Sequence, residues 1–189
     1  MSIAFHKYLW ALRTAMRRFS FGAIGKMTYM GPVNSLAGTK RIFLGNKVRI
    51  QSGCRLETHG TGEIHIKDDV SIGQNFHCTA GGKLIIGSHT TISGNTFITD
   101  MDHDYQEIGK HILEQPMKVT NTVIGENCFI GYGVAIQAGT KLGKQCVVGA
   151  NAVVRGEFSD FCVLVGVPAR VIKRYNTNTG QWEKVHNGN

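Results

Sequence analysis

The chain has 189 residues with 24 glycines and only 3 prolines, which is long enough for one domain with a sizeable core. No apolar run reaches the roughly 18 residues that suggest a membrane-spanning helix, and the N-terminus is too basic and too interrupted for a signal peptide. The net charge is +8, and the whole excess lies in residues 1–56, which contain ten Lys or Arg and no Asp or Glu.

Residues 1–40 are predicted to form a basic amphipathic helix and a lead-in. Within residues 2–20, apolar residues recur at i, i+4, i+7, i+11 and i+14, with Ser2 as N-cap and Gly22 as stop. We expect this stripe to cap the open end of the following domain, and contact with an anionic membrane is a second role. No zinc-finger spacing or RNA-binding signature accompanies the charge, so nucleic acid is not expected. The stripe consists of Phe5, Leu9, Leu12, Met16 and Phe19.

Within residues 41–175 an aliphatic residue recurs at every sixth position in five groups of three, with Cys78 as the one exception. A period of six fits neither a helix nor a half-buried strand, but it fits a short strand followed by a turn. Three such units close one triangular coil, and coils stack as parallel strands about 4.8 Å apart. The sequence therefore predicts an all-β parallel β-helix of about five coils, followed by a short tail at 176–189. The repeat residues are Leu44, Ile50, Leu56, Ile66, Ile72, Cys78, Ile86, Ile92, Ile98, Ile124, Ile130, Ile136, Leu142, Val148 and Val154.

Glycine and cysteine keep phase with the repeat. Glycine directly follows the repeat residue in seven units, where we expect the backbone to bend. Cys54, Cys128 and Cys146 each fall four residues after a repeat aliphatic, at a slot that elsewhere holds small side chains. They are expected to be small buried hydrophobes in a reducing, intracellular compartment. Neither the cysteines nor the histidines show the spacing of a metal site, so no metal is expected.

Residues 99–123 interrupt the repeat, which resumes in phase at Ile124. A coil can extrude a loop without losing its core, and long loops in compact domains are usually functional. The sequence therefore predicts a polar, functional loop that contains His103 and His111.

Two stretches, "VIGENCFIGYGVAIQAGTKLGKQCVVGANAVV" and "VGVPARVIKRY", resemble the hexapeptide-repeat acyltransferases. The nearest branch is that of maltose and galactoside O-acetyltransferases and of polysaccharide O-acetyltransferases. The resemblance covers roughly residues 40–175. It implies a left-handed β-helix, a homotrimer, acetyl-CoA as donor and an active site between subunits.

The resemblance also implies a catalytic histidine. His103 stands five positions after Ile98, as in the galactoside-type pattern, and the Asp-His-Asn-His of many relatives is Asp-Met-Asp-His in this chain. Histidine titrates near neutral pH and can take the proton of an attacking hydroxyl. Asp100, Asp102 or Asp104 could orient the imidazole, and the alternative is that they stabilise turns.

Donor and substrate contacts follow from the same resemblance. Members of the family run the pantetheine arm along a groove of small residues and hold the nucleotide with cations. Arg155 stands one residue away from the usual Thr-Lys position, and a solvated basic tail is the alternative reading for Lys173. Phe129 and Met117 match acceptor-side positions, with external packing and loop anchoring as alternatives. The donor residues implied are Tyr132, Gly149, Ala150, Arg155, Arg170 and Lys173.

The resulting expectation is an acetyl-CoA-dependent O-acetyltransferase that modifies a sugar hydroxyl in surface-polysaccharide synthesis. We expect it in the cytoplasm, with the inner face of the membrane as a second location. A non-catalytic β-helix scaffold and an N-acetyltransferase acting on an amino sugar remain alternatives.

Overall fold

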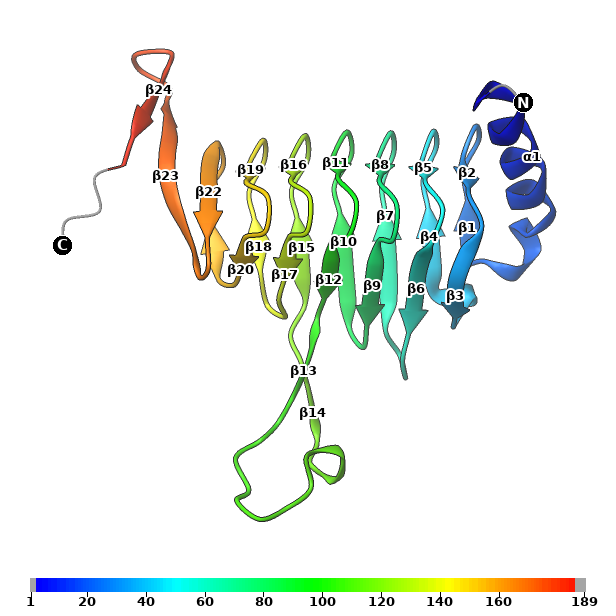
Figure 1. Ribbon diagram of the computed structural model, residues 1–189, viewed down its shortest axis with the longest axis horizontal. Helices are drawn as coiled ribbons and strands as arrows, with labels where there is room; N and C mark the ends of the chain where they lie inside the picture. Colours follow the sequence, from blue (N-terminus) through cyan, green and yellow to red (C-terminus); the bar gives the residue numbers. More distant parts are fainter. Residues whose placement is uncertain (1–2, 186–189) are drawn as a thin grey trace.

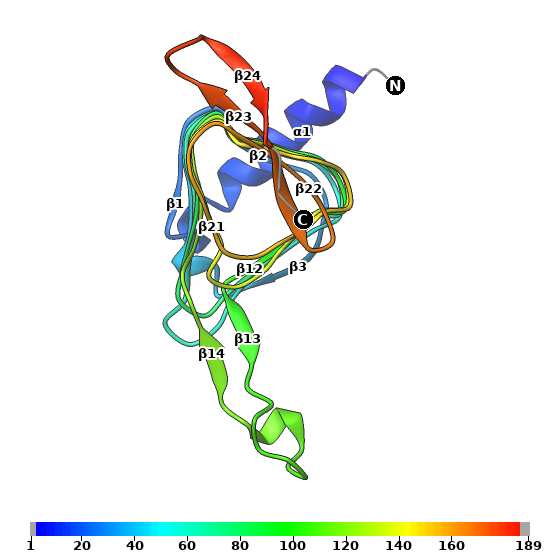
Figure 2. The ribbon, with the colours of Figure 1, turned by 90° about the vertical axis from the view of Figure 1, so that its left-hand side faces the viewer.

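The protein is a triangular parallel β-helix with one helix at its N-terminal end and one extended hairpin on its side (Figures 1 and 2). The structure is a computed structural model that describes residues 3–185, with side chains from residue 6 onward. The expected N-cap Ser2 and the last four residues of the expected tail lie outside this range, as does the side chain of Phe5.

Three sheets form the faces of the prism. All seven strands of the first sheet are parallel. In the second sheet the first seven strands are parallel, and two antiparallel strands extend it at its C-terminal edge. The first sheet contains β1 (Ala23–Ile24), β4 (Ile42–Leu44), β7 (Glu63–Ile66), β10 (Lys83–Ile86), β15 (Thr122–Ile124), β18 (Lys141–Leu142) and β21 (Glu157–Phe158). The second contains β2 (Tyr29–Met30), β5 (Arg49–Ile50), β8 (Ser71–Ile72), β11 (Thr91–Ile92), β16 (Phe129–Ile130), β19 (Val147–Val148), β22 (Cys162–Gly166), β23 (Ala169–Asn176) and β24 (Gln181–Lys184).

The third face is a parallel sheet from which the side hairpin departs. It contains β3 (Val33–Ala37), β6 (Cys54–Thr58), β9 (His77–Ala80), β12 (Phe97–Thr99), β17 (Ala135–Ile136) and β20 (Val153–Val154). The hairpin pairs β13 (Met101–His103) with β14 (Met117–Val119). Short 3-10 turns are η1 (Arg18–Ser20), η2 (Thr39–Arg41) and η3 (Ile112–Glu114).

The six-residue repeat builds the core. Ile50, Ile72, Ile92, Ile130 and Val148 occupy equivalent positions in successive coils and are at most 2 % exposed. Their side chains stack along the axis of the prism, which removes them from water and stabilises each coil through its neighbours. All five cysteines are free and buried, as the repeat predicts for Cys54, Cys78, Cys128 and Cys146.

The prism has seven coils, in place of the five expected from the sequence. The additional first coil lies within the expected lead-in, where Ile24, Met30 and Leu36 keep the six-residue spacing. The additional last coil is out of phase, because Phe158 follows Val154 by only four residues. The β-helix therefore begins at Ala23, earlier than the expected boundary at residue 41.

The glycines that follow a repeat residue allow the backbones of neighbouring coils to approach closely. A Cβ at Gly87 would lie 2.5 Å from the carbonyl carbon of Gly125, and one at Gly125 would lie 2.3 Å from the carbonyl oxygen of Gly143. Neither Gly87 nor Gly125 has a positive φ. These positions require glycine because any side chain would collide with the next coil, and the bend itself does not require it.

The N-terminal helix α1 (Ile3–Met16) caps the first coil, but with a different face from the one expected. The Met30 N–H, at the edge of the second sheet, donates to the Thr14 hydroxyl at 2.9 Å, and the Trp10 ring lies 6.2 Å from that of Tyr29. The predicted apolar stripe faces solvent, with Leu12 59 % and Met16 67 % exposed. The stripe therefore does not form the capping contact.

A membrane-spanning helix is not found within residues 3–185, because no helix there is both long and apolar enough.

Candidate active site

The hairpin β13–β14 projects from the corner that follows β12 (Figures 1 and 2). Its two strands are antiparallel, and Asp104 N–H donates to the Pro116 carbonyl at 3.0 Å where they diverge. The Gln115 side chain closes the loop beyond: its oxygen accepts from Glu107 N–H, and its amide donates to the carbonyls of Glu107 and Lys110. The loop is thus an ordered arm with its own hydrogen bonds.

Asp100 anchors the base of this arm. Its side chain is fully buried, and its two oxygens accept hydrogen bonds from Gly81 N–H at 2.8 Å and Gly82 N–H at 3.0 Å. Burial raises the pKa of the Asp100 carboxyl, while the two N–H donors act in the opposite direction. No hydrogen bond joins Asp100 to His103, so Asp100 holds the arm to the preceding coil and does not contact the imidazole.

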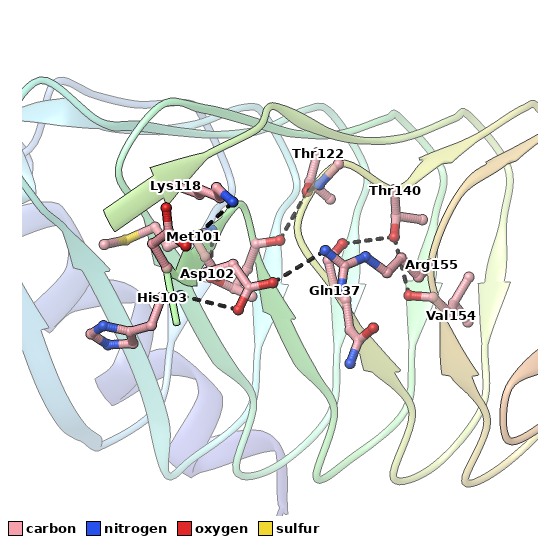
Figure 3. Close-up of polar contacts among 12 residues, drawn as sticks. Met101, Asp102, His103, Lys118, Thr122, Gln137, Thr140, Val154 and Arg155 are labelled. Carbon is pink, nitrogen blue, oxygen red and sulfur yellow. Dashed lines mark hydrogen bonds and ion pairs between the residues drawn. The ribbon is translucent and has the colours of Figure 1, made fainter. Parts of the chain in front are cut away.

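His103 lies directly opposite Met117 across the hairpin, so the structure brings these two predicted residues together. The imidazole points away from the Asp102 carboxylate (Figure 3). Its Nδ1 is buried and has no hydrogen-bond partner within the described part of the chain. Buried polar atoms normally have a partner, and His77 Nε2 is another described side-chain atom in the same state.

Asp102 points along the prism toward the later coils. Its Oδ1 accepts from the His103 backbone N–H at 3.0 Å, and its Oδ2 lies 3.2 Å from the Arg155 guanidinium (Figure 3). Arg155 follows β20, two coils beyond the strand from which the arm departs. This ion pair links the arm to the C-terminal coils. The structure does not place Asp102 to orient the imidazole.

A groove of ≈ 590 Å³ begins at Arg155 and continues toward the C-terminal strands. Three guanidinium groups line it, from Arg155, Arg170 and Arg174, together with the small residues Gly156 and Ala169. Such a cationic groove suits the phosphates of a nucleotide, because arginine forms strong, directed hydrogen bonds with phosphate oxygens. Lys173 lies on β23, as Arg170 and Arg174 do, but it is not among the residues that line the groove.

The remaining predicted donor residues lie at another corner of the prism. Tyr132 follows β16, and Gly149 and Ala150 follow β19, so all three stand between the second and third sheets. Tyr132 lines a separate polar groove of ≈ 380 Å³. Phe129 lies on the outer side of the second sheet, 47 % exposed. Within one chain, these residues are not brought together with His103.

Three contributors were not predicted from sequence. Arg174 lines the cationic groove, Lys118 pairs with Asp104 at 3.5 Å, and Gln115 closes the arm. The basic run after the Gly-x-Pro-Ala-Arg ending is the signal for Arg174. Lys118 and Gln115 have no comparable sequence signal, because their roles depend on how the loop folds back.

Potential metal ligands do not gather within residues 3–185: no group of three or more His, Cys, Asp or Glu side chains could hold an ion.

The fold and the site define a class of protein, the hexapeptide-repeat acyltransferases, and the chain belongs to this family. The family model "Bacterial transferase hexapeptide (six repeats)" matches residues 121–156. Among the relatives, Escherichia coli K12 "Putative lipopolysaccharide biosynthesis O-acetyl transferase WbbJ" is 36% identical over 144 residues, which cover 70% of this chain and 71% of the relative.

Two further proteins are similar over most of their length. The "dTDP-4-amino-4,6-dideoxy-D-glucose acyltransferase" of Escherichia coli is 27% identical over 177 residues, which cover 90% of this chain and 91% of that protein. The structure of AntD, an N-acyltransferase from Bacillus cereus in complex with dTDP and 3-hydroxybutyryl-CoA, superposes with a TM-score of 0.73 at 20% identity. The match covers 88% of this chain and 90% of AntD, and it shows the shared fold.

Proposed function

We propose that this protein transfers the acetyl group of acetyl-CoA to a sugar hydroxyl in the synthesis of a surface polysaccharide. The observation that carries the proposal is the position of His103, on an arm that an arginine of the cationic groove holds in place. The name of the lipopolysaccharide relative supports a hydroxyl acceptor on a glycan. A scaffold would need neither the arm nor the groove.

In this mechanism His103 is the general base. The acceptor hydroxyl hydrogen-bonds the imidazole, gives up its proton to it and attacks the thioester carbonyl carbon. The C–S bond then breaks, and the imidazolium passes the proton to the departing sulfur, so that CoA leaves as the thiol and the imidazole is neutral again. Such base assistance contributes roughly 10²–10⁴-fold. Asp102 acts indirectly, through the arm and Arg155, while Phe129 and Met117 are proposed to face the acceptor side.

Direct transfer agrees with the state of the cysteines. All five are buried; burial raises the pKa of the Cys54 thiol to about 11, whereas the hydrogen bond with Cys128 lowers the pKa of the Cys146 thiol to about 7. Reactive cysteines are at least partly exposed, and none of these five is. We therefore propose no acetylated cysteine on the reaction path.

Donor binding is divided between two corners. Arg155 and Arg170 are proposed to hold the phosphates of acetyl-CoA. Lys173 is proposed to lie nearby, on β23 together with Arg170. Tyr132, Gly149 and Ala150 are proposed to line the path of the pantetheine arm. Because these two sets lie at different corners of one chain, a complete site requires a second copy.

A homotrimer would supply that copy. The tip of the arm exposes large apolar side chains, with Ile108 97 %, Leu113 71 % and Tyr105 68 % exposed. Exposed apolar residues at the end of a projecting arm suit burial against a neighbouring subunit. The unpartnered Nδ1 of His103 is consistent with completion of the site by that neighbour.

Acyl transfer to the amino group of a sugar nucleotide is the second candidate. It is favoured by the similarity over 91% of the dTDP-4-amino-4,6-dideoxy-D-glucose acyltransferase. A direct comparison of an amino-sugar nucleotide with hydroxyl acceptors distinguishes the two reactions. For location, we propose the cytoplasm, which supplies acetyl-CoA, with peripheral contact at the inner face of the membrane through residues 2–20.

The central test compares His103→Ala with His111→Ala, a histidine of the same loop whose Nδ1 accepts only from Leu113 N–H. The rate of acceptor-dependent CoA release is measured, or slow acetyl-CoA hydrolysis if no acceptor is in hand. His103→Ala should lower kcat by at least about 100-fold while acetyl-CoA affinity stays unchanged. His111→Ala should keep kcat. Wild-type turnover in His103→Ala, or an acetylated cysteine detected by mass spectrometry, contradicts the mechanism.

A further inference from the structure

The outer face of α1 carries an apolar patch that no other described residue covers. Tyr8, Leu12 and Met16 lie four residues apart, and therefore along one line of the helix, with exposures of 75 %, 59 % and 67 %. Leu9 lies beside this line, one turn before Leu12, and Phe19 lies in η1 after the helix; they are 43 % and 88 % exposed. We refer to these five residues as the outer patch. Single exposed apolar residues are ordinary, but five large ones on one short segment suggest a binding surface.

The outer patch is separate from the contact that caps the β-helix. Thr14, on the opposite side of α1, is buried and accepts from Met30 N–H, and Trp10 lies against Tyr29. These contacts fix the rotation of the helix about its own axis. The outer patch therefore faces solvent because the helix is held in this orientation.

Exposed basic residues occur on the same segment as the outer patch. Lys7, Arg13 and Arg18 are exposed on α1 and the turn after it, and residues 1–56 contain ten cations without one acid. Two copies that met through this surface would bring like charges together without any acid to pair them. An anionic lipid surface accepts both features, because its headgroups attract the cations and its acyl region takes up the apolar side chains.

We propose that α1 binds an anionic lipid bilayer, with the outer patch inserted at the boundary between headgroups and acyl chains and with Arg13 and the other exposed cations of this end of the chain near the headgroups. This specifies the surface and the chemical partner behind the proposed peripheral location.

The position of α1 makes this contact compatible with an open active site. The helix covers one end of the prism, and the β23–β24 hairpin with the cationic groove lies at the other end (Figure 1). The arm departs from the fourth coil. With a spacing of about 4.8 Å per coil, that is roughly 15 Å along the axis from the first coil, which α1 covers. On the proposed function, a bilayer at α1 would bring the arm near an acceptor sugar that is carried on a lipid.

Sedimentation with vesicles tests the proposal on the full chain. One vesicle preparation is phosphatidylcholine alone, and the other contains equal parts of phosphatidylcholine and phosphatidylglycerol. The wild type should sediment with the anionic vesicles only. Leu12→Glu should weaken that binding at least about tenfold, since a charge replaces an inserted side chain. Arg13→Gln should weaken it about fivefold.

Val167→Glu is the matched control, because Val167 is 70 % exposed at the far end of the prism. It should bind vesicles as the wild type does and keep the wild-type melting temperature, while the two α1 variants should keep both the wild-type melting temperature and acetyl-CoA turnover with a soluble acceptor. Equal sedimentation of wild type and Leu12→Glu overturns the proposal, as does a change of oligomeric state on Leu12→Glu without a change in vesicle binding. Because binding is measured without turnover, it remains interpretable even if the proposed reaction is wrong.

Discussion

Arg155 reaches Asp102 across two coils, with Nη2 and Oδ2 3.2 Å apart. The two side chains are 61% and 45% exposed, and exposed ion pairs contribute only about 0–1 kcal/mol to stability. The pair therefore matters for where the arm lies, and Arg155 both contacts the arm and lines the cationic groove.

A charge exchange separates these two roles of Arg155. Arg155→Asp should lower kcat/KM with little change in melting temperature, because it repels Asp102 and removes a cation from the groove. If the ion pair positions the arm, Asp102→Arg in the same chain should recover part of kcat. If Arg155 acts only on the donor phosphates, the double variant should stay as impaired as the single one. Steady-state kinetics on the four proteins decide between these roles.

Asp100 should behave as an anchor. Asp100→Ala removes the acceptor of two backbone N–H groups in a buried place, which should destabilise the fold by on the order of 2–3 kcal/mol. The control is Asp68→Ala, where an exposed carboxylate accepts from Asn46 N–H. This variant should lose less stability than Asp100→Ala. Urea unfolding measures both. A drop in kcat at unchanged stability would show instead that Asp100 orients His103.

Arg170 should be required for donor affinity. Arg170→Ala removes a charge-assisted phosphate contact of roughly 1.5–3 kcal/mol, and acetyl-CoA binding should weaken accordingly. Lys173→Ala should have a smaller effect, because Lys173 does not line the groove. Calorimetry on the folded variants provides the comparison. Equal affinity of Arg170→Ala and wild type would remove Arg170 from the phosphate site.

Protonation of Glu57 should lower the free energy of unfolding at acid pH. Hydrogen bonds from Arg55 and Ser35 lower the pKa of Glu57 from 4.5 to about 2. A carboxyl whose pKa is lowered by folding stabilises the protein above its unfolded pKa, and this contribution is lost as the pH falls toward 2. Glu57→Gln should flatten the dependence of the unfolding free energy on pH in that window. Glu126→Gln, at an exposed position, should not.

The period of the repeat made the fold predictable, because only stacked coils put every sixth residue into one core. The helix face was not predictable in the same way. An amphipathic pattern shows that two faces differ, but the capping contact was decided by an edge N–H at Met30 that needed an acceptor. Likewise, the roles of Asp100 and Asp102 depend on Gly82 and Arg155, which are distant in sequence.

The arm also has a consequence for how the chain folds. Neighbouring coils elsewhere join residues about 20 positions apart, as in the bond from Thr79 to Thr99, whereas across the arm Lys83 bonds to Asn121 at a separation of 38. Doubling the length of a closed loop costs only about 0.6 kcal/mol in chain entropy. The stack can therefore assemble coil by coil on both sides of the arm, because the length of the arm changes the chain entropy only slightly. Chains that share this prism can consequently differ in the length of the arm while the order in which their coils form stays the same.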